Sequence, residues 1–276
     1  MGELDDNLLK LYYFYGLWLG DGFCSKNGNS YDIYMSIGKD EEGLAQFYDS
    51  LVSMLFGRKC VHVHKDKEQT RRFTDKQLFK SLESMFGTNA YNKRIPEFIK
   101  HLPHNHKRAF LQGYLDSDGS VFLDRDKVRV NFTSVNLELL EDIQDMLFGM
   151  GIANSIVMHQ QECTNKQGIH SKQSYRINIS RSDQSELKYA PVYRSRKIQL
   201  LEKSYALSAS KMGIKFDDHN ILIKVESIED SSYTGIVYNF ECETHTFMCR
   251  NILTHNCDPL MSAGYNRAKT VNPDNQ

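Results

Sequence analysis

Two aspartates, Asp21 and Asp118, lie in two similar segments, "FYGLWLGDG" (residues 14–22) and "FLQGYLDSDG" (residues 110–119). Each acid follows an apolar, helix-like run with small residues four positions apart, which place a smooth stripe on one helix face. Two such helices packed in parallel would bring the carboxylates together, where they repel unless a cation lies between them. Mg²⁺ suits such a site because it binds a few carboxylates together with water and phosphate oxygens. Paired metal sites of this kind are suited to cleaving two phosphodiester bonds.

The similarity of the two segments extends into a repeat of about 100 residues. Gly16 and Gly113, Gly20 and Ser117, and the two aspartates all match at an offset of 97, and "SLVSMLFG" matches "DIQDMLFG" at an offset of 92. A lysine follows at the same distance in each copy: Lys93 lies 20 residues after Phe73, and Lys197 lies 20 residues after Ile177. The sequence therefore predicts two related halves around a pseudo-twofold axis.

Each half has the same expected order of elements. After the helix that ends at the Asp-Gly pair, alternating segments such as "YDIYMSIG" and "VRVNFTSV" predict a hairpin. An amphipathic helix, two more strands and a closing helix follow. The pattern αββαββα, occurring twice, predicts an α+β fold with helices on one face of antiparallel sheets.

A second group of reactive residues, His255, Asn256 and Cys257, follows a short apolar strand near the C-terminal end. An asparagine side chain can attack its own backbone carbonyl and break the peptide bond, and an adjacent histidine can move the protons. A thiol directly after that bond can accept an acyl chain as a thioester. These three residues are therefore suited to protein splicing.

The composition is that of an ordinary globular protein. The 276 residues are 40% hydrophobic and 25% charged, with a net charge of −1, so positive charge must gather on one face if a nucleic acid binds. The six cysteines form no CxxC pair, which indicates a reducing intracellular compartment, cytoplasm or nucleus. No secretion signal and no apolar run of membrane-spanning length is found, so no membrane partner is expected.

The paired motifs resemble those of single-chain LAGLIDADG homing endonucleases over residues 7–205. The resemblance implies a monomeric, Mg²⁺-dependent double-strand DNA endonuclease whose sheets form a saddle over the major groove. It assigns the metal ligands to Asp21 and Asp118, and "NKRIPEF" resembles the lysine motif of intein-borne members, which assigns Lys93 as catalytic. The repeat selects Lys197 as the second catalytic lysine, with Lys188 as the alternative.

Three pairs of basic residues are predicted phosphate contacts. They are Arg71 and Arg72, Lys107 and Arg108, and Arg194 and Arg196. Two alternative functions stay open at this point: a DNA-binding module without cleavage, similar to maturase relatives, and a splicing segment joined to an inactive nuclease.

The segment from Val237 to Cys257 resembles the C-terminal splicing motifs of inteins. The resemblance implies His245 as an assisting histidine, His255 as the penultimate histidine, Asn256 as the cyclising residue and Cys257 as the first extein residue. The expected domains are two endonuclease halves (1–105 and 106–207), a small all-β segment that is half of a Hint domain (208–256) and an extein tail (257–276). A complementary N-terminal intein fragment is the expected partner, from a natural split or from truncation.

Overall fold

The computed structural model contains two compact units, residues 1–212 and 213–276, which are described separately. The structure describes residues 3–64, 68–125, 127–164, 170–179, 187 and 192–203 of the first unit. Of the second unit it describes residues 215–216, 221–222, 227, 229, 234, 246–249 and 252–255.

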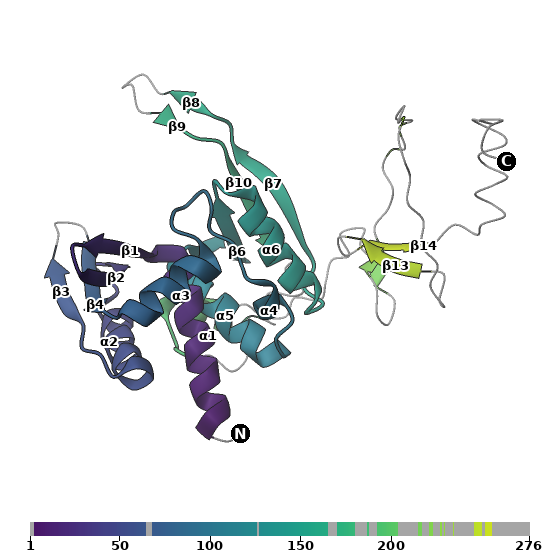
Figure 1. Ribbon diagram of the computed structural model, residues 1–276. Coiled ribbons are helices and arrows are strands. Elements are labelled where there is room, and N and C mark those ends of the chain that lie inside the picture. The colour runs from purple at the N-terminus through teal and green to yellow at the C-terminus, as the bar shows by residue number, and fades with distance from the viewer. Residues whose placement is uncertain are drawn as a thin grey trace, which may run out of the picture. The chain divides into compact units, whose positions relative to one another are not determined.

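The first unit consists of two halves with similar element order (Figure 1). The first half comprises α1 (Glu3–Asp21), β1 (Gly22–Asn27), β2 (Ser30–Gly38), α2 (Glu42–Phe56), β3 (Val61–His64), β4 (Glu68–Thr74) and α3 (Lys76–Phe86). After the short α4 (Glu97–Lys100), the second half comprises α5 (His104–Ser117), β5 (Gly119–Asp124), β6 (Lys127–Ser134), α6 (Leu137–Phe148), β7 (Asn154–Gln160), β8 (Cys163–Thr164), β9 (His170–Ser171), β10 (Ser174–Ile179) and α7 (Arg196–Glu202). The predicted α+β fold with two αββαββα-like halves is confirmed. The small β8–β9 hairpin, which the sequence did not predict, extends the second half.

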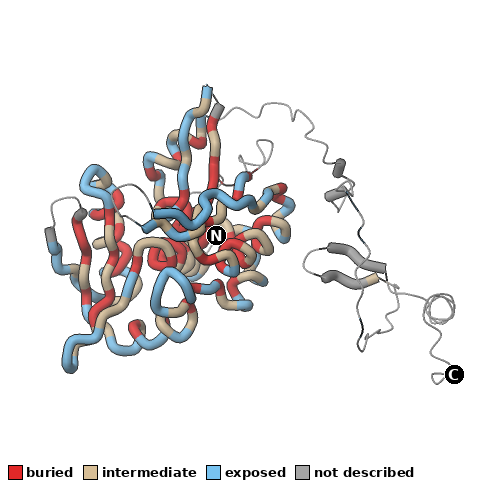
Figure 2. Tube along the Cα trace, turned by 90° about the horizontal axis from the view of Figure 1, so that it is seen from above, coloured by how far each residue is buried: buried red, intermediate tan, exposed pale blue. Residues whose placement is uncertain are grey.

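The two four-stranded sheets have the same topology. Their strand orders are β1-β2-β4-β3 and β5-β6-β10-β7, and every pair of neighbours is antiparallel. Alternate residues of each central strand, such as Ile33 and Met35 on β2 and Val130 and Phe132 on β6, are buried in the core. Figure 2 shows buried residues along the helices and strands of this unit. The opposite sheet faces therefore carry the side chains available to a ligand.

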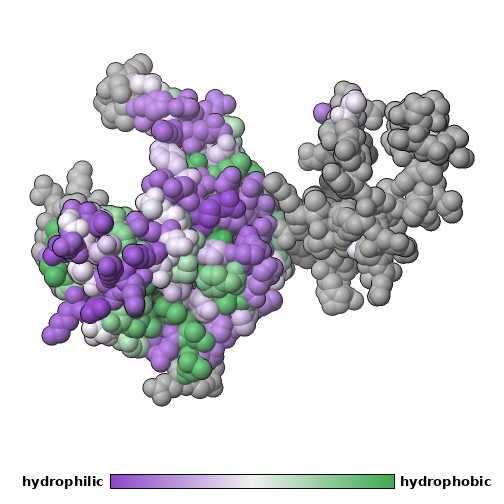
Figure 3. Space-filling model, in the orientation of Figure 1, coloured by the Kyte–Doolittle hydropathy of each residue, from purple (hydrophilic) through white to green (hydrophobic). Residues whose placement is uncertain are grey.

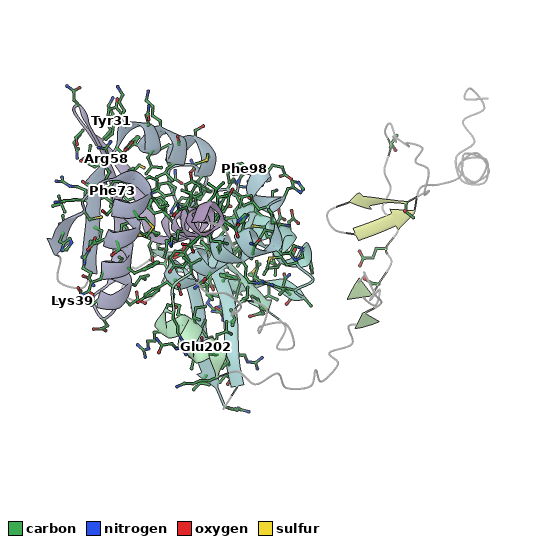
Figure 4. All side chains as sticks on the ribbon, turned by 90° about the horizontal axis from the view of Figure 1, so that it is seen from below. Tyr31, Lys39, Arg58, Phe73, Phe98 and Glu202 are labelled. Atoms are coloured by element: carbon green, nitrogen blue, oxygen red, sulfur yellow. The ribbon has the colours of Figure 1, made fainter. Side chains whose placement is uncertain are left out.

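Helices α1 and α5 pack against each other through their glycines. A Cβ atom on Gly16 would lie 2.0 Å from the carbonyl oxygen of Phe110, and one on Gly113 would lie 2.1 Å from that of Tyr13. These two contacts are related by the repeat offset. A Cβ atom on Gly20 would lie 2.1 Å from the Ser117 Oγ, so the contacts advance from Gly16 to Gly20 on α1 as they advance from Phe110 to Ser117 on α5, and the helices are parallel. Seen end-on in Figure 4, α1 lies at the centre, with side chains packed around it.

We expect Gly16→Ala to destabilise the protein by about 3 kcal/mol, at the upper end of losses from overpacking, because the new methyl meets immobile backbone. Gly57→Ala is the control: Gly57 has φ 62° and open space around it. Only backbone strain of about 1 kcal/mol is expected there. Urea denaturation of both variants measures the difference. Equal losses would contradict a close helix contact.

The described part of the second unit contains two antiparallel hairpins. Strand β11 (Lys215–Phe216) pairs with β12 (Ile221–Leu222), and β13 (Thr246–Cys249) pairs with β14 (Ile252–His255). The β13–β14 hairpin lies within a segment predicted to be β-structure. Among the described residues of the chain, no helix is long and apolar enough to cross a membrane.

Candidate active site

The parallel packing of α1 and α5 brings both predicted acids to one place. Asp21 is the last residue of α1, and Asp118 caps the end of α5, where its backbone N–H donates to the carbonyl of Tyr114. Asp21 is partly exposed and Asp118 is exposed, so a ligand can reach both from solvent.

The surroundings of both carboxylates favour their protonated forms. Burial and, next, the negative charge of Asp118 raise the pKa of Asp21 to about 7. Although Asp118 is exposed, neighbouring protein atoms displace enough water to raise its pKa as well. An acid pair with raised pKa values and solvent access is a feature of functional sites. A cation at such a pair would compete with the proton and would therefore bind more strongly as pH rises.

The two predicted lysines occupy equivalent positions at the ends of these helices. The Lys93 Nζ donates to the carbonyl oxygens of Leu19 at 2.6 Å, Gly20 at 3.0 Å and Gly22 at 2.9 Å. The Lys197 Nζ donates to those of Leu115, Asp116 and Ser117, each at 2.9 Å. The last carbonyls of a helix lack partners within it, and an ammonium group has three N–H donors to supply. Each lysine thus closes one helix end next to an acid.

Each lysine acts more strongly on the acid of the opposite half. Among neighbouring cations, Lys93 lowers the pKa of Asp118 most, whereas Lys197 lowers that of Asp21 most. Burial lowers the pKa of both lysines, and the nearby carboxylates oppose this effect. The four charged groups therefore form one electrostatic unit that spans both halves.

The segment around Lys93 contacts the opposite half through charges. Arg94 donates from Nε to Asp142 of α6 at 2.8 Å, and the Ile95 N–H donates to the same carboxylate at 3.0 Å. Asp142 is only 2% exposed. Lys93 is therefore tied to a helix of the second half.

The segment before Lys197 contacts the opposite half through aromatic rings. Tyr193 stacks on Phe47 of α2, with ring centroids 4.6 Å apart and an angle of 20° between the planes. Both lysines are thus positioned partly by the amphipathic helix of the other half.

The donor set fits a hard divalent cation. Asp21 and Asp118 supply carboxylate oxygens, and no group of three or more His, Cys, Asp or Glu side chains suited to a metal occurs among the described residues. Water and a phosphate would have to complete the coordination shell, which is how Mg²⁺ is usually bound.

The prediction that Arg71 contacts phosphate is wrong. Its side chain is 2% exposed and donates to Asp49 of α2 at 3.2 Å and to Gln69 at 3.0 Å. Successive residues of a strand face opposite sides of the sheet, so only Arg72 of this pair faces away from the helices. The Arg72 side chain is 39% exposed and lies 3.9 Å from Asp32.

The residues of the other two basic pairs differ in exposure or in their partners. Lys107 is 8% exposed, and burial lowers its pKa, so it does not suit a phosphate contact either. Arg108 is partly exposed. Arg194 is exposed but forms an ion pair with Glu202 at 2.6 Å, and Arg196 is exposed.

Sequence reasoning did not single out the polar side chains on the open face of the second sheet. Arg176 lies there, with Nη2 2.7 Å from His159 Nε2, and Arg129 lies on the same face, paired with Asp124. Both occupy strand positions next to buried residues, so the alternation of β6 and β10 could have identified them. Figure 3 shows mostly hydrophilic residues along the extension that carries β7 and β8.

The residues of the predicted splicing site are mostly outside the described part of the chain. His255 is the last residue of β14, where its backbone pairs with Thr246. His245, Asn256 and Cys257 lie outside the described residues, as does Lys188, the alternative to Lys197.

Comparisons with known proteins define the class of this fold. Residues 105–188 match the LAGLIDADG-like domain family. The structure is similar to that of I-DmoI in complex with DNA and Ca, with a TM-score of 0.53 and 19% identity over 71% of this chain and 98% of that one. Mesophilic variants of the homing endonuclease I-DmoI give a TM-score of 0.50 at 20% identity, over 67% of this chain and 89% of that one. Residues 105–188 are thus similar to a LAGLIDADG-like domain, and the first unit has the fold of I-DmoI.

Similar sequences occur within larger proteins. The chain is 28% identical over 259 residues to the DNA polymerase of Thermococcus hydrothermalis, and 26% identical over 262 residues to the ATP-dependent DNA helicase Hel308 of Thermococcus kodakarensis. Each match covers 91% of this chain but only 15% and 21% of the respective relative. The first match extends beyond the first compact unit, so part of the similarity lies after Met212.

We expect Asp21→Asn to stabilise the protein at pH 8. The pKa of Asp21 is about 7 in the folded state, above its unfolded value. Between these two pH values the folded state binds one proton more than the unfolded state, so the protein loses stability as pH rises toward 7. Removing the charge should recover on the order of 1–2 kcal/mol at pH 8, after allowance for solvent screening, and little at pH 4. Thermal unfolding at both pH values measures this. A variant less stable than wild type at pH 8 would refute the repulsion.

Proposed function

We propose that the first unit is a divalent-metal-dependent endonuclease that cuts both strands of a specific double-stranded DNA site. The observation that carries this proposal is the twofold arrangement of Asp21 and Asp118, each beside a lysine that caps a helix. The similarity to I-DmoI, which has been crystallised with DNA and Ca, supports DNA as the ligand. A monomer suffices, because one chain supplies both acids.

Asp21 and Asp118 would hold the metal, and Mg²⁺ would supply Lewis-acid stabilisation of a phosphodiester oxygen. The ammonium groups of Lys93 and Lys197 would add positive charge beside the phosphate as its negative charge builds up. Because each lysine also closes a helix end, its position is defined before the substrate arrives. Arg72, Arg129 and Arg176, on the open sheet faces, would contact the DNA.

A binding module without cleavage is the alternative, but the site does not favour it. In a module that only bound DNA, two adjacent carboxylates would weaken the binding of the negatively charged DNA. Both acids would repel phosphate unless a metal neutralised them. Their retention at equivalent positions, each near a buried lysine, therefore favours the enzyme.

Asp21→Asn and Asp118→Asn should each lower the rate of double-strand cleavage by more than about 100-fold, the loss typical of removing one electrostatic stabiliser. DNA binding should persist, because the basic sheet residues remain. The wild-type protein is first incubated with Mg²⁺ and a plasmid library carrying random inserts, and linear products identify the target. Cleavage and gel-shift assays on that target then compare the variants.

Asp6→Asn is the control for these two variants. It makes the same chemical change at the exposed start of α1, where Asp6 bonds only to Lys10 in the described structure. It should cut at the wild-type rate. Normal double-strand cutting by both active-site variants would exclude Asp21 and Asp118 as metal ligands. Failure of the wild type to cut any library member would leave the binding-module alternative.

We further propose that the C-terminal segment takes part in protein splicing. His255 would move protons, Asn256 would cyclise and break the bond that follows it, and Cys257 would accept the acyl chain. The β13–β14 hairpin places the backbone of His255 at a strand end, next to this sequence. A complementary N-terminal splicing segment would supply the first thioester. The extent of the polymerase match beyond the first unit supports a common origin for both units.

Without that complementary segment, the protein should slowly release the tail 257–276, because asparagine cyclisation needs only local groups. Asn256→Ala should abolish release, and Cys257→Ala should permit it, since the thiol serves only acyl transfer. Mass spectrometry over a time course detects the freed tail and the C-terminal succinimide. Tail release at the wild-type rate from the Asn256→Ala protein would eliminate this mechanism.

A further inference from the structure

Asp116 is a buried aspartate of α5 that contacts Lys197. Asp116 is 1% exposed and follows the last apolar residue of α5. Its Oδ2 accepts a hydrogen bond from the Tyr13 hydroxyl of α1 at 2.7 Å, and its Oδ1 accepts one from the Ser195 hydroxyl. Its backbone carbonyl accepts one from the Lys197 Nζ at 2.9 Å. These partners bind both carboxylate oxygens and link α5 to α1 and to the segment that carries Lys197.

The first half has no carboxylate at the equivalent position. By the repeat offset, Asp116 corresponds to Leu19, which is also 1% exposed. Lys93 is positioned by other contacts: its N–H donates to the Asn89 carbonyl at 3.1 Å, and its carbonyl accepts from the Asn136 Nδ2 at 2.7 Å. The ammonium groups of Lys93 and Lys197 thus make equivalent contacts, but different residues hold the two lysine segments in place.

Asp116 controls the start of the helix that carries Lys197. Ser195 is the N-cap of α7, and its Oγ accepts from the Ile198 N–H at 3.1 Å while it donates to Asp116. A residue in the N-cap position sets where the helix begins. Lys197 is the second residue of α7, so a shift of Ser195 moves the base of the lysine side chain.

Asp116 also compensates the charge of Lys197. Burial raises the pKa of Asp116, and the hydrogen bonds from Ser195 and Tyr13 oppose this effect. Among the charges that favour protonated Lys197, Asp116 has the largest effect. A partly buried ammonium group needs such a counter-ion because burial disfavours its charged form.

We propose that Asp116 is a positioning residue for Lys197, acting through the Ser195 N-cap, and that it sets the rate of cutting of one DNA strand separately from the other. This inference rests on the proposed endonuclease function. Asp116 itself does not touch the DNA, since it is buried. Tyr13 links the carboxylate to α1, so the position of Lys197 depends on both halves.

Three variants separate this role from general stability. Asp116→Leu copies the first half and removes both hydrogen bonds and the charge. Asp116→Asn retains the shape and one acceptor oxygen, and it serves if the leucine variant fails to fold. Asn136→Asp is the matched control for Lys93, although Asn136 itself is the N-cap of α6 in the second half. It retains the acceptor for the Leu139 N–H and replaces the amide that donates to the Lys93 carbonyl with a carboxylate oxygen.

The first measurement needs no DNA. The variants and the wild type are treated with a limiting amount of acetic anhydride, and mass spectrometry of peptides gives the acylation rate of each lysine. Asp116→Leu or Asp116→Asn should raise the reactivity of Lys197 severalfold and leave that of Lys93 within about twofold. No change at Lys197, or equal increases at both lysines, would overturn the positioning role.

The second measurement follows each strand of the target duplex with a separate end label. The Asp116 variants should slow the cutting of one strand by at least about tenfold, the usual effect of losing a residue that orients a functional group, and nicked DNA should accumulate. Asn136→Asp should slow the opposite strand. Equal slowing of both strands by the Asp116 variants would overturn the claim of separate control.

The endonuclease function and the positioning role of Asp116 can be tested separately. If the wild type cuts no DNA, the proposed endonuclease function and the claim about strand rates both fall. The acylation rates then still decide whether Asp116 positions Lys197. If the wild type cuts and Lys197 reactivity does not respond to Asp116, only the positioning inference falls.

Discussion

The contact between α1 and α5 is the constraint on which the site depends. Two helix backbones approach so closely that neither Gly16 nor Gly113 can carry a side chain. Because the helices are parallel and in register, both end at the same level, and the acids at their ends must meet. A larger residue in the contact would move the carboxylates apart as well as strain the core. The packing of two glycines therefore determines the distance between two charged groups several residues away.

This packing holds an electrostatic arrangement that is unfavourable by itself. Burial raises the pKa values of Asp21 and Asp118, the charge of Asp118 raises that of Asp21 further, and burial lowers the pKa values of Lys93 and Lys197. All four groups are thus less inclined to be charged than they would be in water. The arrangement persists because the hydrophobic core and the helix-end carbonyls position the groups. The charged groups of the site therefore lower the stability of the folded protein, as functional sites often do.

Much of this architecture could be predicted because the sequence repeats. The register of the two copies identified the paired helices, both acids and both lysines, since a repeat reports equivalent positions without knowledge of contacts. Arg71 and Lys107 were misjudged because a count of charges ignores the direction of side chains. Alternation along β4 turns Arg71 toward α2, and α5 is buried on the side that carries Lys107.

Other features could not be predicted because they depend on contacts between distant segments. No periodicity links Asp116 to Tyr13 and Ser195, or Tyr193 to Phe47, across 79 to 146 positions of sequence. These contacts follow from the packing of one half on the other. They also distinguish the halves, which the repeat presents as equivalent. The replacement of Leu19 by Asp116 is visible in the repeat, but its role follows only from the contacts of Asp116 in the structure.

The cross-contacts of the two lysine segments limit how such a protein can diversify. Arg94 of the first half pairs with Asp142 of the second, whereas Tyr193 of the second half stacks on Phe47 of the first. A half transplanted into a related protein would bring its own lysine but lose the helix that supports it. Recombination between relatives would have to exchange α2 or α6 together with the opposite lysine segment. The two repeated halves thus depend on each other, and each lysine segment would have to be exchanged together with the helix of the opposite half that it contacts.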